Sequence, residues 1–457
     1  MEIPFLSTTA LAAAIRAGDL SATGVLEAHL AQIARHNPTL NAIVTLDADG
    51  ARARAQEADA ALARGECWGP LHGVPFTLKD AFATARMRTT VGFPPLAEYV
   101  PQEDSTVAAR LKAAGGILLG KTNVPTMLGD YQCNNPIFGR TNNPWDPART
   151  SGGSSGGAAA ALAAGMTPFE IGSDLSGSIR LPAHFCGVYG LKPTEGRVPL
   201  TGMVPDPRDT PRSVRLMSCA GPLARTVDDL ALLYRLIAGP DGRDTEVPPL
   251  PIAAVSALDL NGLRIAVAPT FPGLPVAAEI RDAVTGLAQQ LAQAGAIVEE
   301  ATLPDLDFGR ELKSAGELIG MMVGVFEQDA GTPPLTLAHY LEALHRRDRS
   351  IRVWEQFFGQ WDALLCPTSL VTAFPHCEPG VPLRVDDRDE TYWFASAHTT
   401  LFNYTGHPAL AVPYTRDRDG LPLGVQLVAK RWAESRLLGI AQAIAPLTGG
   451  FQRPAGY

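Results

Sequence analysis

The chain has 457 residues, a formal net charge of −9 at pH 7, 46% hydrophobic and 19% charged residues. This composition is typical of a packed globular protein and excludes a fibrous or disordered chain. The acidic balance argues against direct nucleic-acid binding, which needs basic stripes. Residues 1–20 contain Glu2 and Arg16 and lack the apolar core of a signal peptide, and the small-residue run 156–166 is too short to span a bilayer. We therefore expect a cytoplasmic protein without membrane association.

The cysteines and histidines give no sign of a metal centre or a disulfide framework. No CxxC or HExxH pattern occurs, and the nine histidines form no ligand cluster. The six cysteines are scattered, which favours reduced thiols: Cys67, Cys133, Cys186, Cys219, Cys366 and Cys377. The sequence thus predicts neither a metal nor a cofactor.

The first quarter of the chain changes from helices to alternating strands and helices. Residues 7–64 show helical periodicity, with Ser21 as a helix cap. Beyond them, the apolar runs 74–78 and 117–119 predict strands, and residues 105–114 between them predict a helix. This alternation favours an α/β layered fold.

The second half begins with a surface connection at 238–261, which is rich in Gly and Pro. Strands are predicted again at 264–268, 363–366 and 425–429. The Pro-rich stretch 367–382 has the composition of a long functional loop or of an exposed connector.

Two serine-bearing glycine loops and one lysine carry the chemistry. The loops are Gly152-Gly-Ser-Ser-Gly-Gly157 and Asp174-Leu-Ser-Gly-Ser-Ile-Arg180, and Lys79 follows the apolar run 74–78. Glycine lets backbone N–H groups approach a substrate closely. A serine hydroxyl becomes a nucleophile once a base removes its proton, and a desolvated lysine is such a base. The pattern therefore predicts a serine nucleophile site.

Three other interpretations are weaker. The G-x-S-x-G pattern at 152–156 resembles a hydrolase elbow, but that elbow must follow an apolar strand, and 144–150 is polar. A phosphate-binding loop would end in Lys-Ser or Lys-Thr, whereas Ala158 and Ala159 follow here. By itself, Lys79 would be read as a surface lysine with a buried stem.

The intervals between these residues resemble the amidase signature family, the Ser–Ser–Lys hydrolases. Lys79 and Ser154 are 75 residues apart, and Ser154 and Ser178 are 24 apart. The resemblance covers most of 60–235 and leaves 260–400 as the divergent part. Further similar segments are 139–145, 185–194, 221–226, 403–409 and 420–427.

The resemblance implies one α/β amidase domain over 1–457, with a large mixed central sheet covered by helices on both faces. Residues 60–235 would form its signature core, and 260–400 would face the substrate. It assigns Lys79 as the catalytic lysine, Ser154 as the bridging serine of a cis peptide after Gly153, and Ser178 as the nucleophile that accepts the acyl group.

The resemblance also places an oxyanion hole at the backbone of Leu175, Ser176 and Gly177, whose N–H groups would bind the developing negative charge. The family usually has glycine where this chain has Ser176. A Cβ narrows the accessible backbone angles, so this departure bears on the loop geometry or on the substrate range.

Supporting roles are expected for three neighbouring residues. Ser155 would cap a helix over 157–164 and direct its positive end at the site. Asp174 and Arg180 would hold the nucleophile loop through a charge-assisted bond, or would form a solvated pair of little consequence.

Two sets of residues are candidates for the substrate pocket. The resemblance places Met127, Tyr131, Gln132 and Cys133 near the acyl group. A second set in the divergent part either lines an apolar pocket or, as is more frequent for such side chains, packs in the core: Met321, Met322, Phe326, Trp393 and Phe394.

The sequence thus predicts an amide hydrolase that cleaves a non-peptide carboxamide through a serine acyl-enzyme. Its partner would be a small-molecule amide, and a homodimer is left open. The alternatives are a glutamyl-tRNA amidotransferase A-type subunit, which would release ammonia for a partner protein, and an esterase that uses the same triad. A binding protein in which Ser176 closes the oxyanion loop is a rival from another class.

Overall fold

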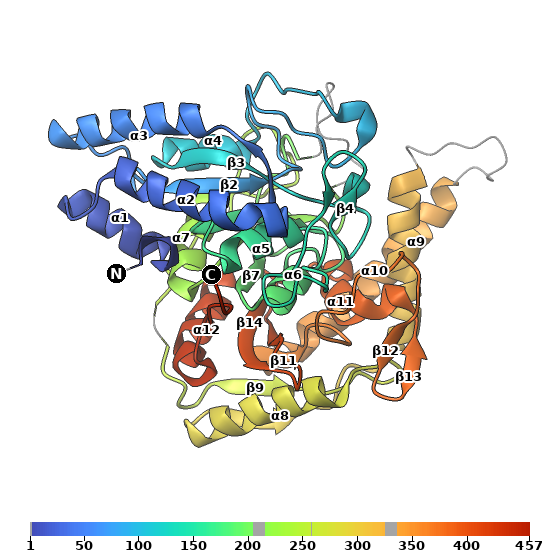
Figure 1. Cartoon of the computed structure of the whole chain (residues 1–457). Coiled ribbons are helices and arrows are strands. Elements are labelled where there is room, and N and C mark those ends of the chain that lie inside the picture. Colours follow the sequence, from blue (N-terminus) through green and yellow to red (C-terminus); the bar gives the residue numbers. More distant parts are fainter. Residues whose placement is uncertain (1, 204–214, 257, 325–335) are drawn as a thin grey trace.

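The computed structural model describes residues 2–203, 215–256, 258–324 and 336–457. Within these residues the main sheet has eight strands (Figure 1). Their order is β10 (Ile297–Glu300), β9 (Arg264–Val267), β11 (Ala363–Pro367), β15 (Pro422–Val428), β14 (Ala409–Arg416), β7 (Tyr189–Lys192), β8 (Cys219–Ala224) and β6 (Phe169–Asp174).

The sheet is mixed, as predicted. β10, β9 and β11 run parallel, and every pair from β11 to β6 is antiparallel. The three strands expected in the second half of the chain are present as β9, β11 and β15. The other five strands of the sheet, β6, β7, β8, β10 and β14, were not predicted.

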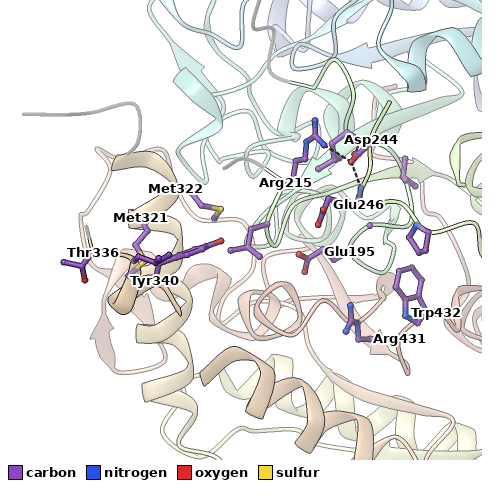
Figure 2. A pocket seen from close by; sticks show the side chains of 16 residues that line it. Glu195, Arg215, Asp244, Glu246, Met321, Met322, Thr336, Tyr340, Arg431 and Trp432 are labelled. Carbon is purple, nitrogen blue, oxygen red and sulfur yellow. Dashed lines mark hydrogen bonds and ion pairs between the residues drawn. The ribbon is translucent and has the colours of Figure 1, made fainter. Parts of the chain in front are cut away.

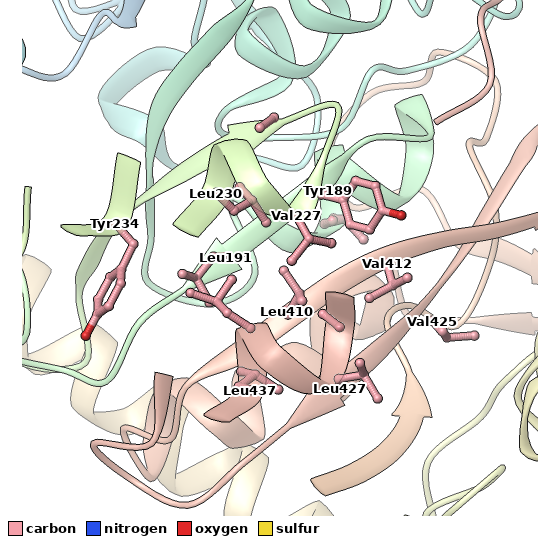
Figure 3. Packing of buried hydrophobic residues seen from close by; sticks show 14 of the residues in the cluster. Tyr189, Leu191, Val227, Leu230, Tyr234, Leu410, Val412, Val425, Leu427 and Leu437 are labelled. Carbon is pink, nitrogen blue, oxygen red and sulfur yellow. The ribbon is translucent and has the colours of Figure 1, made fainter. Parts of the chain in front are cut away.

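Helices cover both faces of this sheet because its central strands are apolar on both sides. Leu410 and Val412 of β14 pack toward α7 (Val227–Ile237) and α12 (Glu434–Thr448), as Figure 3 shows. Ala411, between them, packs in a second apolar cluster. That cluster also contains residues of α2 (Ala22–Leu40), α5 (Gly156–Ala163) and α6 (Arg180–Cys186). The predicted two-sided α/β architecture is confirmed.

A small three-stranded sheet supplies the lysine. In it, β3 (Ile117–Thr122) pairs in parallel with β2 (Pro75–Lys79) and antiparallel with β1 (Ile43–Leu46). The predicted strands β2 and β3 are present, and α4 (Thr106–Ala113) lies between them in the chain.

The helical entry segment is correct apart from one strand. It contains α1 (Thr8–Ala17), α2 and α3 (Ala48–Ala63), and the Ser21 side chain caps α2 by accepting from Gly24 N–H. Strand β1 was missed because four residues give too little period-2 pattern to stand out between two helices.

The Pro-rich stretch 367–382 and the remaining elements complete the described fold. Residues 368–374 of the Pro-rich stretch are buried, so an exposed connector is wrong for that half. The other elements are α8 (Ala278–Gln293), α9 (Phe308–Gly324), α10 (Leu337–Phe357), α11 (Ala397–Tyr404), the β4–β5 pair (Asn134–Asn135, Gly139–Arg140), the β12–β13 pair (Leu383–Val385, Arg388–Glu390) and short 3-10 helices at Ile3–Phe5, Pro94–Leu96, Thr126–Leu128 and Tyr392–Ser396.

Among the helices that the structure describes, none has the length and apolar character needed to cross a membrane.

The core predicts a contrast between two leucine truncations. Leu427→Ala in β15 removes a side chain with no exposed surface, so it should lower the free energy of unfolding by about 2–5 kcal/mol. Leu341→Ala in α10 removes a side chain that is 54% exposed and should have a much smaller effect. Urea unfolding followed by circular dichroism measures both, and equal losses would contradict the packing described.

Candidate active site

Lys79 ends strand β2 inside the protein, where its ammonium group would lack hydration. Its Nζ lies 2.8 Å from Ser154 Oγ, 3.0 Å from Ser173 Oγ and 3.3 Å from the Ser173 carbonyl oxygen. Burial lowers the pKa of Lys79 to about 7, although the nearby charges of Cys133, Asp174 and Glu170 oppose this shift. The neutral amine is therefore available near neutral pH.

Ser154 stands in the cis peptide that the resemblance implied. The Gly153–Ser154 bond is cis, and Ser154 is buried. A Cβ on Gly153 would overlap the carbonyl oxygen of Asp130 and the backbone of Tyr131. The 130–131 segment thus packs directly against this peptide, and glycine is required there.

Ser178 lies in the turn between β6 and α6, beside the cis peptide. Its carbonyl oxygen accepts a hydrogen bond from Ser155 N–H at 3.1 Å, which joins the two serine loops. The residue is 8% exposed, so the loop that carries it is largely enclosed. The structure brings Lys79 and Ser154 into direct contact and places Ser178 on the adjoining loop.

A buried carboxylate shapes the nucleophile loop. Asp174 accepts hydrogen bonds from Gly177 N–H (2.8 Å) and Ile179 N–H (3.1 Å), and from the Arg180 guanidinium at 3.1 and 2.9 Å. Both charged side chains are fully buried, so the alternative of a solvated pair is wrong. Burial alone would raise the pKa of Asp174, but Arg180 holds it well below its usual range.

This arrangement changes the expected set of oxyanion donors. The Gly177 N–H is already bonded to Asp174, whereas within the described residues the N–H groups of Leu175 and Ser176 have no protein acceptor. Gly177 has φ +119°, and a Cβ there would overlap Thr399 Oγ1, so only glycine fits. Ser176 has no positive φ and needs no such freedom.

Two side chains at the start of α5 have roles other than those expected. Ser155 occupies the N-cap position, but its side chain makes no cap; its Oγ donates to the Ser173 carbonyl at 3.4 Å. The Cys133 Sγ accepts from Gly156 N–H at 3.2 Å and donates to the Ser154 carbonyl at 3.4 Å. Cys133 is buried, and these two bonds connect it to the cis-peptide loop.

The other three pocket candidates differ in their exposure and in their contacts. Gln132 is buried and bonds both backbone groups of Cys377, at 2.7 and 3.1 Å, which ties down a distant segment. Met127 is 47% exposed. Tyr131 is half-buried, and its hydroxyl lies 2.6 Å from Ser396 Oγ.

A cavity of about 720 Å³ lies apart from the serine loops. Met321, Met322, Tyr340 and Trp432 are among its lining residues (Figure 2), and its described lining contains no residue of either serine loop. Trp393 packs edge-on against Tyr131, and Phe394 packs against the core. These side chains therefore do not gather in one pocket; Phe326 lies outside the described residues.

Two residues of the site were not predicted from the sequence. Ser173 and Glu170 both lie on β6, where a short polar-and-glycine pattern hid the strand. The position of Ser173 directly before Asp174 was the only signal for it. Burial raises the pKa of Glu170 to about 7, and a glutamate between Phe169 and Ile171 was the available sign.

Within the described part of the chain, no group of three or more His, Cys, Asp or Glu side chains could hold a metal ion.

Comparison with known proteins identifies the family of this chain. The family model Amidase matches residues 24–319 and 329–438. The A-type subunit of the glutamyl-tRNA(Gln) amidotransferase of Thermosynechococcus vestitus is 35% identical, over 95% of this chain and 96% of that protein.

Two solved structures share the fold. One is a chain of a structure described as an unexpected vestigial protein complex that reveals the evolutionary origins of an s-triazine catabolic enzyme, with 30% identity, a TM-score of 0.87 and coverage of 98% of this chain and 100% of that one. The other is a bacterial aryl acylamidase of the amidase signature enzymes, with 26% identity, a TM-score of 0.86 and coverage of 97% and 96%. The chain belongs to the amidase signature family, whose members act on carbon–nitrogen bonds.

The buried ion pair predicts a strong effect on stability. Asp174→Asn leaves the Arg180 guanidinium without its counter-charge in the interior and should cost about 3–5 kcal/mol of unfolding free energy. Glu66→Gln breaks the exposed pair with Arg64 and should leave the urea midpoint unchanged. Similar midpoints for the two variants would show that Asp174 does not organise the loop.

Proposed function

We propose that the chain hydrolyses a carboxamide through an acyl-enzyme on Ser178, with Ser154 and Lys79 as the proton relay. The contact between a buried, readily neutralised Lys79 and the cis Ser154 carries the proposal. A buried amine with this bond is placed to receive a proton from a serine hydroxyl.

The surroundings of Lys79 favour one orientation of its lone pair. The Ser173 carbonyl can only accept, so one N–H of the neutral amine points to it, and a second N–H points to Ser173 Oγ. The lone pair is then left for the hydroxyl of Ser154 at 2.8 Å. Ser154 can pass its proton to Lys79 and take one from Ser178.

The reaction then follows in two stages, the formation of an acyl-enzyme and its hydrolysis. Ser178 Oγ attacks the carbonyl carbon as its proton moves through Ser154 to Lys79, and loop N–H groups, with Leu175 and Ser176 as the free donors, bind the oxyanion. The proton returns through Ser154 to the leaving nitrogen, the C–N bond breaks, and an acyl-Ser178 ester remains. Water attacks this ester, returning the proton to Ser178 and releasing the acid.

A second candidate function is that of an amidotransferase A-type subunit, in which the ammonia passes to a partner protein. The similarity to an amidotransferase A-type subunit over 95% of the chain favours this candidate over a free-standing hydrolase. Both functions need the same acyl-enzyme and differ in substrate and partner. Ester cleavage by the same serine overlaps with both.

The two functions can be separated by assay. Under the amidotransferase proposal, the full chain isolated from its source brings a partner with it and releases ammonia from glutamine. A free-standing hydrolase acts alone and prefers another member of a panel of aliphatic, aromatic and amino-acid amides. Turnover of glutamine by the isolated chain at the rate of its best amide would argue against a need for the partner.

Replacement of the serines tests their roles. Ser178→Ala should reduce turnover below about 1% of wild type and abolish fluorophosphonate labelling, because no other oxygen forms the acyl-enzyme. Ser154→Ala should be less severe, since water can replace part of the relay. Steady-state kinetics and mass spectrometry measure both; a more severe loss at Ser154 would reverse the assignment.

The pKa of Lys79 fixes the direction of the pH dependence. Burial lowers this pKa to about 7, so below pH 7 the side chain is the ammonium and lacks the lone pair that the relay needs. The rate should rise about tenfold per pH unit below 7 and level off above it. A pH profile of kcat/KM checks this, and an acidic limb near pH 10 would indicate an ordinary lysine.

Matched amide and ester substrates test what Lys79 does. Lys79→Ala should remove most of the amide activity and less of the ester activity, because only the amide leaving group needs the returned proton. Equal losses would limit Lys79 to activating the nucleophile.

A further inference from the structure

Ser176, the residue that departs from the family pattern, lies in a cluster of hydroxyl groups two residues before the nucleophile. Tyr131 Oη is 2.6 Å from Ser396 Oγ, and Ser396 Oγ is 3.1 Å from Thr400 Oγ1. Thr400 Oγ1 donates to the Ser176 carbonyl at 3.3 Å. Burial raises the pKa of the Tyr131 phenol, and hydrogen bonds from Ser396 and Ser176 oppose that rise. The cluster therefore starts and ends at Ser176.

The proton count gives these bonds one direction. Each hydroxyl has a single hydrogen to donate. Thr400 donates to a carbonyl, which can only accept, so Thr400 Oγ1 accepts from Ser396. Ser396 in turn accepts from Tyr131, which lies 2.6 Å away and is nearer than the Trp393 carbonyl at 3.4 Å. The Tyr131 oxygen is then left to accept from the Ser176 hydroxyl, the contact that opposes the rise in the Tyr131 pKa. We call these four hydroxyls, of Ser176, Tyr131, Ser396 and Thr400, the hydroxyl ring.

The hydroxyl ring holds the peptide group that follows Ser176. The Ser176 carbonyl accepts from Thr400 Oγ1 and also lies 2.9 Å from Thr399 Oγ1, whose single hydrogen is shared with the Ser396 carbonyl at 2.9 Å. On the other side of that peptide, the Gly177 N–H is bonded to Asp174. With both ends fixed, the directions of the neighbouring N–H groups are fixed as well, which is what an oxyanion site requires.

The residues that complete the ring are themselves anchored. Ser396 and Thr400 are buried, at the start of α11. The Tyr131 ring packs against the rings of Tyr392 and Trp393, with centroids 5.6 Å away in both cases. Tyr131 is therefore held in place by packing, and its hydroxyl serves the ring.

We propose that Ser176 and Tyr131 are positioning residues of this enzyme, which hold the oxyanion loop in its working geometry through the hydroxyl ring. A glycine at position 176 offers no hydroxyl, so this chain orders by side-chain bonds a loop that the family builds from glycine. The inference rests on the proposed acyl-enzyme at Ser178. Neither side chain touches the reacting atoms, so loss of either hydroxyl should slow the chemical step without weakening substrate binding.

Fluorophosphonate labelling of Ser178 tests the ring without knowledge of the substrate, because phosphonylation also develops charge on an oxygen in the oxyanion site. Tyr131→Phe and Ser176→Ala should each lower the labelling rate constant about tenfold. The double variant should be less than about twofold slower than the slower single variant, since both changes open the same ring. Tyr414→Phe, which removes a phenol hydroxyl from β14, should label at the wild-type rate.

Steady-state kinetics on the best amide of the panel add a second readout. We expect kcat to fall with the labelling rate, KM to stay within about twofold, and the acidic limb of the pH profile to stay in place, because Lys79 is untouched. Thermal unfolding and near-UV circular dichroism establish that each variant is folded. If Tyr131→Phe fails to fold, Ser176→Ala decides alone.

The outcomes separate the inference from the proposed function. Wild-type labelling rates in both single variants, or fully additive losses in the double variant, overturn the hydroxyl ring and leave the acyl-enzyme standing. A wild-type protein that is not labelled at Ser178 overturns the proposed function and the ring together.

Discussion

The removal of water from Lys79 is the constraint on which the site depends. An amine at the end of an apolar strand loses hydration that no single neighbour replaces, so the charged form is disfavoured and the pKa falls to about 7. The contacts of Lys79 with the hydroxyls of Ser154 and Ser173 then orient a neutral amine. Had the lysine been solvated, the same contacts would have held an ammonium with no capacity to accept a proton.

A second buried charge, that of Arg180, holds the nucleophile loop in place. Arg180 joins Asp174 of the nucleophile loop to Gln426 of β15 and Asn403 of α11, which are more than 200 residues away in the sequence. Asn403 in turn donates to the Asp174 carbonyl at 3.0 Å. The carboxyl-terminal third of the chain thus fixes the geometry of a loop that belongs to the signature core.

Residues of the carboxyl-terminal third also contact the nucleophile loop at Ser176 and Gly177. Thr399 crowds Gly177 and forces glycine there, while Ser176 tolerates a side chain because its backbone has no positive φ. A serine in a loop usually built from glycine therefore imposes no strain. Hydrolase and amidotransferase chemistry both need this loop, so the choice between them depends on what reaches Ser178 and on what binds the protein.

Local sequence determined the chemical groups and much of the framework. The loops 152–157 and 174–180 and their spacing from Lys79 indicated the serine site, and apolar runs located β2, β9, β11 and β15. The cis peptide before Ser154 was implied by the family resemblance alone. These features follow from short-range patterns of glycine, serine and apolar residues.

The tertiary structure decided which of those groups meet. Ser173 and Glu170 became part of the site because β6 lies next to β2, and Cys133 became a helix cap because its thiol meets the first N–H of α5. The sequence left open whether Asp174 and Arg180 form a buried or a solvated pair, and the structure shows that both side chains are fully buried. Contacts between distant segments and the loss of water on packing are properties of the folded chain, so no local pattern could specify them.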